Sequence, residues 1–182
     1  MRLLFYMSLV SLLSLSGIAR AERLITVEPV VGYEQTQEAW PSAHSHDYLF
    51  YGARATAGLR LLSAEAEYLH GVDEESFPLQ SQSYQKTLDN LKVGVRSRLG
   101  PGFFTVNLRA GVQAEQDKSS QTVAGVTVSS TSLAYHAYGG AGVGIRLARV
   151  LYLEAELVAI LVNTQDLSQT QYQLTGGLGF GF

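Results

Sequence analysis

The chain of 182 residues contains no cysteine, so no disulfide bond can stabilise it. Proline occurs only four times, and charged residues make up only 16% of the sequence. A protein without disulfides must take its stability from the fold itself, and a closed ladder of strands can supply that stability. The formal net charge is −3 and no basic patch or stripe occurs, which argues against a nucleic-acid partner.

Long apolar runs are also scarce, and none beyond the N-terminus reaches the roughly 20 residues of a membrane-spanning helix. The N-terminus has the features of a signal peptide: Arg2, an apolar run over residues 3–15, and the A-x-A site Ala19-Arg20-Ala21. We expect residues 1–21 to direct export by the Sec pathway, with cleavage after Ala21. Residues 22–182 would then form a single domain. An uncleaved anchor is the alternative, and the lack of a cysteine argues against a lipoprotein.

What the sequence does contain is a period of two, clearest over the last eleven residues. One parity there is mostly apolar and aromatic, and the other is polar or glycine. The first set comprises Tyr172, Leu174, Gly176, Leu178, Phe180 and Phe182. This alternation predicts a strand. Eleven residues also suffice to cross a bilayer at a tilt, which takes about 9–11 residues.

Seven further segments alternate in the same way, at about residues 25–34, 48–61, 64–68, 91–99, 104–115, 133–147 and 151–161. Three tight turns are predicted, at Leu62-Ser63, Gly100-Pro101-Gly102 and Ala148-Arg149. They alternate with four polar loops, at residues 35–47, 70–86, 116–131 and 163–170. This arrangement predicts an all-β fold, an eight-stranded antiparallel up-and-down transmembrane β-barrel with both termini on the periplasmic side.

Two local features qualify that plan. Pro29 removes a ladder donor from the first strand and would mark a local departure from ideal pairing, such as a bulge. Residues 122–128 could fold back about Ala124-Gly125, as a hairpin extending beyond the membrane.

Within the eight strands, every charged side chain lies opposite the apolar face. The acidic members are Glu28, Glu34, Glu65, Glu67, Glu115, Glu154 and Glu156, and the basic members are Arg54, Arg60, Lys92, Arg96, Arg98, Arg109 and Arg146. A charge facing lipid at the midplane costs about 2–4 kcal/mol, so these side chains are predicted to face the lumen. Because eight strands leave only enough room for side chains, we expect a salt-bridged interior. An ion-conducting lumen or a catalytic acid pair, such as Glu154 and Glu156, is the functional alternative.

Aromatic residues are grouped on the apolar parity at the two ends of the strands. Tyr33, Tyr51, Tyr68, Tyr135 and Tyr172 lie at the loop ends, and Phe104 and Phe182 lie at the turn end. This distribution is typical of the two aromatic girdles at the membrane interfaces.

Three other groups of residues have a structural and a functional interpretation. Glycines 140, 142 and 144 lack the helix that a nucleotide-binding loop needs. With glycines 177, 179 and 181, they are better explained as inward positions left empty for neighbours, with Tyr152 close to Gly179 and Gly181. His44 and His46, with Glu74 and Glu75, could bind a metal, although a solvated polar loop is the simpler interpretation. His136 is predicted to face inward near the outer rim, as a hydrogen-bonded core residue.

The signal peptide, the eight alternating strands and the terminal Phe182 together resemble the small outer-membrane barrels of the OmpA transmembrane domain and OmpX/Ail type. That resemblance implies a bacterial outer-membrane protein surrounded by lipid and lipopolysaccharide. It also implies that the barrel insertion machinery reads the closing strand ending at Phe182. No enzyme activity, cofactor or metal is implied. The protein would act in envelope integrity, adhesion or surface binding through its four external loops, with residues 122–128 as a candidate for β-augmentation.

Three alternatives stay open at this point. Lipid A deacylase barrels are similar in size and use a His with a nearby Ser on the lipid-facing side, whereas His136 is followed by Ala137 and Tyr138 and has inward parity. A His and a Ser meeting at the outer rim on the lipid face would favour such an enzyme. A narrow ion pore is the second alternative. The third is a soluble lipocalin-like barrel, which would place apolar residues inside.

Overall fold

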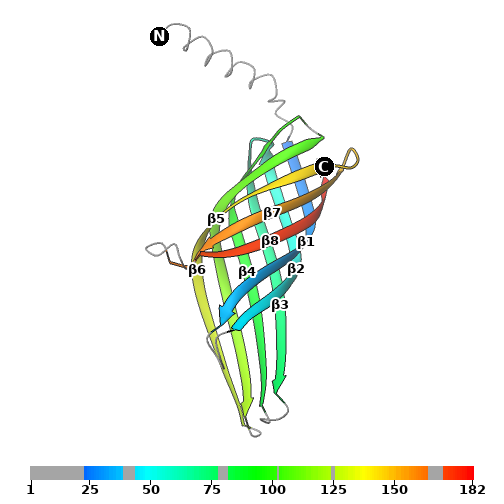
Figure 1. Ribbon diagram of the computed structural model, residues 1–182. Coiled ribbons are helices and arrows are strands. Elements are labelled where there is room, and N and C mark those ends of the chain that lie inside the picture. The colour runs from blue at the N-terminus through cyan, green and yellow to red at the C-terminus, as the bar shows by residue number, and fades with distance from the viewer. Residues whose placement is uncertain (1–22, 39–43, 78–81, 102, 124–125, 164–169) are drawn as a thin grey trace.

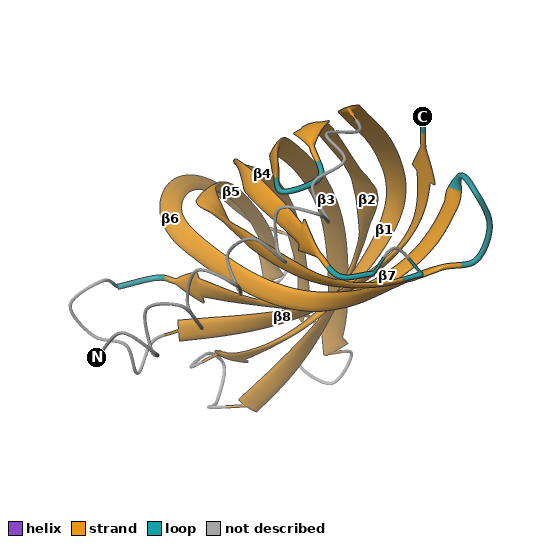
Figure 2. Cartoon of the chain, turned by 90° about the horizontal axis from the view of Figure 1, so that it is seen from above, coloured by secondary structure: helices purple, strands orange, loops and turns teal. Residues whose placement is uncertain are grey.

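In a computed structural model, the described residues, 23–38, 44–77, 82–101, 103–123, 126–163 and 170–182, form a closed antiparallel barrel (Figures 1 and 2). The strands are β1 (Arg23–Glu38), β2 (His44–Leu59), β3 (Leu62–Phe77), β4 (Gln82–Leu99), β5 (Phe104–Val123), β6 (Val126–Arg146), β7 (Leu151–Leu161) and β8 (Thr170–Gly181). Each strand pairs with its sequence neighbours, and β8 closes the barrel against β1. The predicted eight-stranded up-and-down barrel is confirmed. Among the described residues, no helix is long and apolar enough to span a membrane.

The alternation of the sequence appears directly as alternation of burial. In β7, Leu153 and Leu157 are about half exposed on the outer surface, whereas Glu154 and Glu156 between them are only 2% exposed. The outer surface is therefore apolar and the lumen mostly polar, the reverse of a soluble lipocalin-like barrel. All five loop-end tyrosines and both turn-end phenylalanines of the predicted girdles are exposed on this outer surface.

The strands are longer than the sequence pattern indicated, and the predicted extents of three loops were wrong. Strands β3 to β6 extend beyond the other strands at the end opposite the C-terminus (Figure 1). Most of the predicted loops 70–86 and 116–131 is paired strand, with register Phe77↔Gln82 and Val123↔Val126 at the two tips. Residues 35–38 and 44–47 are also paired strand. The hairpin expected over residues 122–128 is present, since Val123 pairs with Val126. Residues 124–125 and 164–169 lie outside the described residues.

The short turns at the opposite end agree with two of the three predicted positions. β4 ends at Leu99 and β5 begins at Phe104, and β6 and β7 are joined over residues 147–150. The β2–β3 turn instead falls on Arg60 and Leu61, because Leu59 pairs with Leu62. Gly100 has φ +129°, and a Cβ there would lie 2.4 Å from the carbonyl oxygen of Phe104, so this turn requires glycine.

Pairing between β1 and β8 is interrupted at Pro29. Val27 pairs with Phe180 and Val30 pairs with Gly177, but neither Glu28 nor Pro29 has a partner on β8. The register is the same on both sides of the interruption, so Pro29 marks a gap in the ladder and not the bulge that the sequence suggested. Proline has no N–H to donate, which accounts for the missing pair.

Candidate functional site

The charged residues meet in the lumen as predicted. Eleven of the fourteen are buried, and the other three, Arg60, Glu115 and Arg146, are partly or fully exposed. The buried members come from β1, β2, β3, β4, β5 and β7, so the network ties most of the barrel wall together.

Arg54, Arg96 and Arg109 occupy the centre of this network. Arg54 contacts Glu67 at 2.6 Å, Glu156 at 2.9 Å and Glu28 at 3.0 Å. Arg109 contacts Glu65 at 2.6 Å and Glu67 at 2.9 Å. Because each carboxylate is shared between cations, the side chains fill the lumen and compensate one another.

The candidate acid pair, Glu154 and Glu156, belongs to the same network. Both carboxylates contact Arg96, and Glu156 also contacts Arg109 at 3.1 Å. Each residue is 2% exposed, so no substrate reaches it from the solvent-exposed ends. The geometry is that of a structural core, and it favours the salt-bridged interior over a catalytic pair.

A second layer of the lumen is apolar and was missed by the sequence analysis. Val30, Tyr48, Phe50, Leu69 and Leu88 form one buried cluster, and Tyr138, Val158 and Ile160 form another. Phe50, Leu69, Val158 and Ile160 are fully buried. Several of these residues adjoin outward apolar ones in the sequence, as in Leu49-Phe50-Tyr51, so alternation gave no signal there. A lumen that contains both ion pairs and packed apolar side chains argues against an open pore.

The inward glycines make room for neighbouring side chains. A Cβ at Gly142 would lie 2.4 Å from Glu156 Cγ, and one at Gly144 would lie 2.5 Å from the hydroxyl of Thr105. The structural interpretation of the glycine run is therefore confirmed.

Tyr152 does not cover the glycine opposite it, although the sequence suggested that it would. It is the cross-strand partner of Gly179, as expected, but Glu28 fills the space above that glycine, 3.0 Å from an added Cβ. The Tyr152 hydroxyl instead accepts a 3.0 Å hydrogen bond from Arg146, whose guanidinium also lies over the ring.

His136 does not supply the features of a catalytic base. It faces inward opposite Gln113, as predicted, and its buried Nδ1 has no hydrogen-bond partner among the described residues. The expectation of a hydrogen-bonded core histidine is thus not met at that nitrogen.

A different histidine lies at the outer rim on the lipid-facing parity. His70 Nδ1 is 2.7 Å from Asp89, which also accepts hydrogen bonds from the Tyr68 hydroxyl at 2.7 Å and Lys118 at 3.0 Å. No hydrogen bond in the described part of the chain joins His70 to a serine. The His–Ser pair that would favour a deacylase is therefore not seen there.

Metal ligands are likewise not gathered in the described part of the chain, where no group of three or more His, Asp or Glu side chains could hold an ion. The side chains of His44, His46, Glu74 and Glu75, the weak candidates from the sequence, lie outside the described residues.

In the part of the chain that the structure describes, one long strand edge of the protruding sheet has no pairing partner. β6 pairs with β5 along its whole length, but its pairing with β7 begins only at Ala137. Residues 126–136 thus present one edge to the surroundings, over about 35 Å at the usual rise per residue. Among the described residues, this is the longest unpaired stretch of any strand.

The exposed part of β6 is paired along one side, with β5. Cross-strand hydroxyl pairs join Ser119 to Ser130 at 2.7 Å and Thr122 to Thr127 at 2.9 Å. Residues 126–133 are exposed, with Val126 and Val128 each 66% exposed. This edge is preformed and offers apolar side chains beside its free backbone groups.

The opposite edge of the protruding sheet differs in sequence. Residues 72–77 of β3 extend beyond its last pair with β2 and contain Asp73, Glu74 and Glu75. Charges along an edge strand oppose pairing with another chain. Residues 126–136 of β6 contain no Asp, Glu, Lys, Arg or Pro, so the features that normally protect an edge are missing on that side alone.

No family model and no curated protein matches this sequence. Solved structures do share its fold. Ail, the attachment invasion locus protein of Yersinia pestis, solved with the heparin analogue sucrose octasulfate, has a TM-score of 0.63 at 9% identity, covering 88% of this chain and 99% of that one.

Two further barrels give similar values. Neisserial surface protein A has a TM-score of 0.60 at 10% identity, covering 87% of this chain and 97% of that chain. The N-terminal β-barrel domain of Pseudomonas aeruginosa OprF has a TM-score of 0.59 at 12% identity, covering 90% and 100%. At such identities the likeness shows the fold alone. The chain therefore has the fold of the small eight-stranded outer-membrane barrels, as the resemblance implied.

Proposed function

We propose that this chain is a non-enzymatic outer-membrane barrel that binds an extended segment of a surface partner along the open edge of β6. The observation that carries the proposal is the unpaired, uncharged stretch of residues 126–136 on a sheet that protrudes beyond the barrel. Free N–H and C=O groups on such an edge give affinity through main-chain hydrogen bonds, and alternate side chains give specificity.

The location belongs to the same proposal. The chain would be exported by the Sec pathway with cleavage after Ala21. The closing strand ending at Phe182 would engage the insertion machinery, and lipid and lipopolysaccharide would surround the apolar outer surface. An apolar outer surface over a charged lumen supports this placement, because a soluble monomer rarely exposes so many large apolar side chains. The connections between β1 and β2 and between β7 and β8 would be secondary contact regions.

The sulfated ligand of Ail is not carried over to this edge. Residues 126–136 contain no lysine or arginine, so they do not offer the cations that a polyanion needs. The expected partner is instead an uncharged, extended peptide.

The direction of the backbone identifies the residue to test. The N–H of Arg146 donates to Phe103 on the β5 side, and successive strand residues point their N–H groups to opposite sides. The β5–β6 register is continuous, so the odd-numbered residues 127–135 direct their N–H groups to the open edge. Thr131→Pro therefore removes an edge donor without removing a ladder bond to β5.

The probe is a synthetic Thr-Val alternating peptide, compared with the same peptide N-methylated at every second residue. Binding to the detergent-solubilised full chain would be followed by fluorescence anisotropy. We expect the unmodified peptide to bind wild type and Thr131→Ala, and to lose most of its affinity for Thr131→Pro. Equal binding of both peptides, or no effect of the proline, would exclude augmentation at β6.

A further inference from the structure

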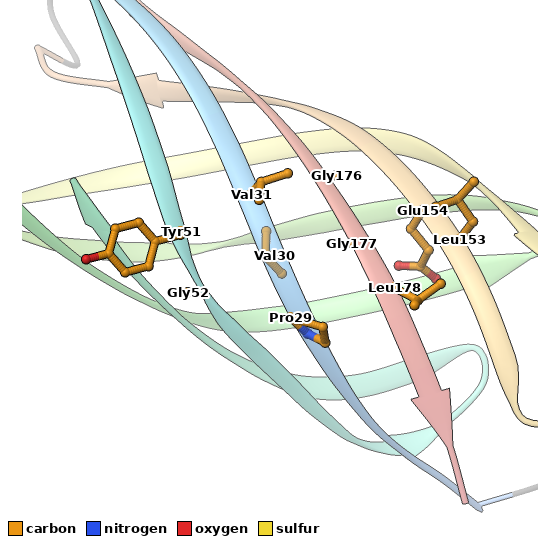
Figure 3. Close-up of a pocket in the computed structure, with 10 residues that line it drawn as sticks. All are labelled: Pro29, Val30, Val31, Tyr51, Gly52, Leu153, Glu154, Gly176, Gly177 and Leu178. Carbon is orange, nitrogen blue, oxygen red and sulfur yellow. The ribbon is translucent and has the colours of Figure 1, made fainter. Parts of the chain in front are cut away.

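An apolar groove of about 530 Å³ lies on the outer wall of the barrel, across strands β7, β8, β1 and β2 (Figure 3). Its walls include Pro29, Val31, Tyr51, Leu153 and Leu178, and Gly176 lies among them. Val31 and Tyr51 are each about 60% exposed, which places the mouth of the groove on the outer surface and not in the lumen. Glu154 of the charged network also contributes to the lining, whereas no residue of the β6 edge does.

Two residues create the groove, and the first is Gly176. This position lies on the apolar parity between Leu174 and Leu178, and its cross-strand neighbours are Val31 and Ala155. A Cβ added to Gly176 would meet only the carbonyl oxygen of Glu154, at 3.7 Å. The glycine therefore leaves open space on an outer face that is otherwise covered by larger side chains.

The second cause of the groove is Pro29. It stands where the β1–β8 ladder is interrupted, and its neighbour on β2 is the small residue Ala53. The strands on either side of the interruption continue in register, so the hollow is built into the wall and does not depend on a displaced strand.

The position of the groove between the two aromatic girdles decides its occupant. It runs from Tyr51, in the tyrosine girdle, to Leu153 and Leu178, which lie close to the short turns and to Phe182. Between the two girdles the surroundings of a membrane barrel are hydrocarbon. A hydrocarbon chain lying in a concave apolar groove touches more atoms than one lying on the convex outer wall, and each contact adds dispersion attraction.

We propose that this groove binds one acyl chain of a phospholipid from the periplasmic leaflet, an inference that rests on the proposed membrane location. The groove reaches the end of the barrel that carries the short turns, and this position favours the periplasmic leaflet. Pro29 and Gly176 are the residues that create the site, and Val31, Leu153 and Leu178 hold the chain.

The first test is native mass spectrometry of the full chain, reconstituted in vesicles of phosphatidylethanolamine and phosphatidylglycerol and extracted in mild detergent. Gly176→Leu fills the groove, and Ala66→Leu adds the same side chain to the outer face of β3, away from it. Wild type and Ala66→Leu should each retain one phospholipid, and Gly176→Leu should lose it several-fold. Equal retention by all three proteins, or no retained lipid, would overturn the proposal. A dimer that Gly176→Leu abolishes would show a second copy in the groove instead.

A second measurement uses wild type alone, so it does not depend on the folding of a variant. A phospholipid with a diazirine in its acyl chain is photolysed in the same vesicles, and the labelled peptides are mapped. Labels concentrated on peptides containing Val31 and Leu178 support the site, whereas labels spread evenly around the barrel overturn it. Failure of the peptide to bind β6 would leave both results unaffected, so the two proposals are tested separately.

Discussion

The Arg54 guanidinium lies among three carboxylates, those of Glu28, Glu67 and Glu156, and is 1% exposed. Arg54→Ala would leave these charges partly uncompensated inside the barrel. We expect a loss of about 3–5 kcal/mol in the free energy of unfolding, the usual result of breaking a buried pair by removing one partner. Urea unfolding in lipid vesicles, followed by the loss of β circular dichroism, measures it.

Arg146 is the matched control, because it is also an inward arginine but is exposed at the turn end. Its contacts are with the hydroxyl and ring of Tyr152. Arg146→Ala should cost no more than about 1 kcal/mol, as expected for an exposed cation–π contact. Equal losses for the two arginines would contradict the central position of Arg54 in the network.

Substitution by alanine should affect the free energy of unfolding differently at two glycines of β6. A Cβ at Gly142 would lie 2.4 Å from both the Ala155 carbonyl oxygen and Glu156 Cγ, whereas one at Gly139 would meet nothing within 4 Å. Gly142→Ala should destabilise by about 1–3 kcal/mol through overpacking. Gly139→Ala should be neutral or stabilising, since alanine restricts the unfolded chain. The same unfolding assay compares them, and a neutral Gly142→Ala would show that both the Glu156 side chain and the backbone at Ala155 move aside.

At individual positions, alternation could predict charged lumen residues but not apolar ones. A charge such as Arg96 is informative, because lipid excludes it from the outer face. Phe50 and Ile160 lie within runs of consecutive apolar residues, where both parities look alike. Their inward direction depends on packing across the lumen, and the sequence of one strand does not show such contacts.

At the level of the element, β6 should show two kinds of amide along one strand. The N–H groups of Thr127, Ser129 and Thr131 point to the open edge, and those of Val128 and Ser130 point to β5. Amide hydrogen exchange followed by NMR in detergent micelles should therefore be fast at the first set and slow at the second.

Residues further along β6 provide the control. Ala141 and Val143 have the same parity as Thr131 but are paired with β7, so their amides should be protected. Uniform protection from residue 126 to 136 would mean that something covers the edge, and uniform fast exchange would mean that the protruding hairpin is not formed.

The positions of the strands could be predicted within the membrane but not beyond it. Between the girdles, lipid on one side and charge on the other enforce a period of two. Beyond them, residues 116–122 and 129–131 are polar on both faces, so the pattern disappears although the strands continue. Their pairing rests on cross-strand contacts such as that between Ser119 and Ser130. These two residues lie 11 positions apart in the sequence, so alternation within one strand does not show the contact.

For the whole molecule, the contents of the lumen bear on the pore alternative. Ion pairs around Arg54 and the apolar cluster around Phe50 occupy the lumen together. Wild type in planar bilayers should therefore show no steady conductance. Phe50→Ala should not open a pathway either, because the ion pairs remain. Steady single-channel currents from wild type would contradict this and restore the pore.

The membrane location can be tested on the intact chain by heat-modifiability. Closing β8 against β1 leaves no free edge within the barrel wall, so unfolding requires many hydrogen bonds to break together. Unheated samples from an outer-membrane fraction should migrate differently from boiled ones on a detergent gel, since the folded barrel resists the detergent at room temperature. Arg54→Ala should lower the temperature at which the folded band disappears, and Arg146→Ala should not. A soluble periplasmic protein without a folded band would refute the membrane location, and the apolar outer surface would then require another partner to cover it.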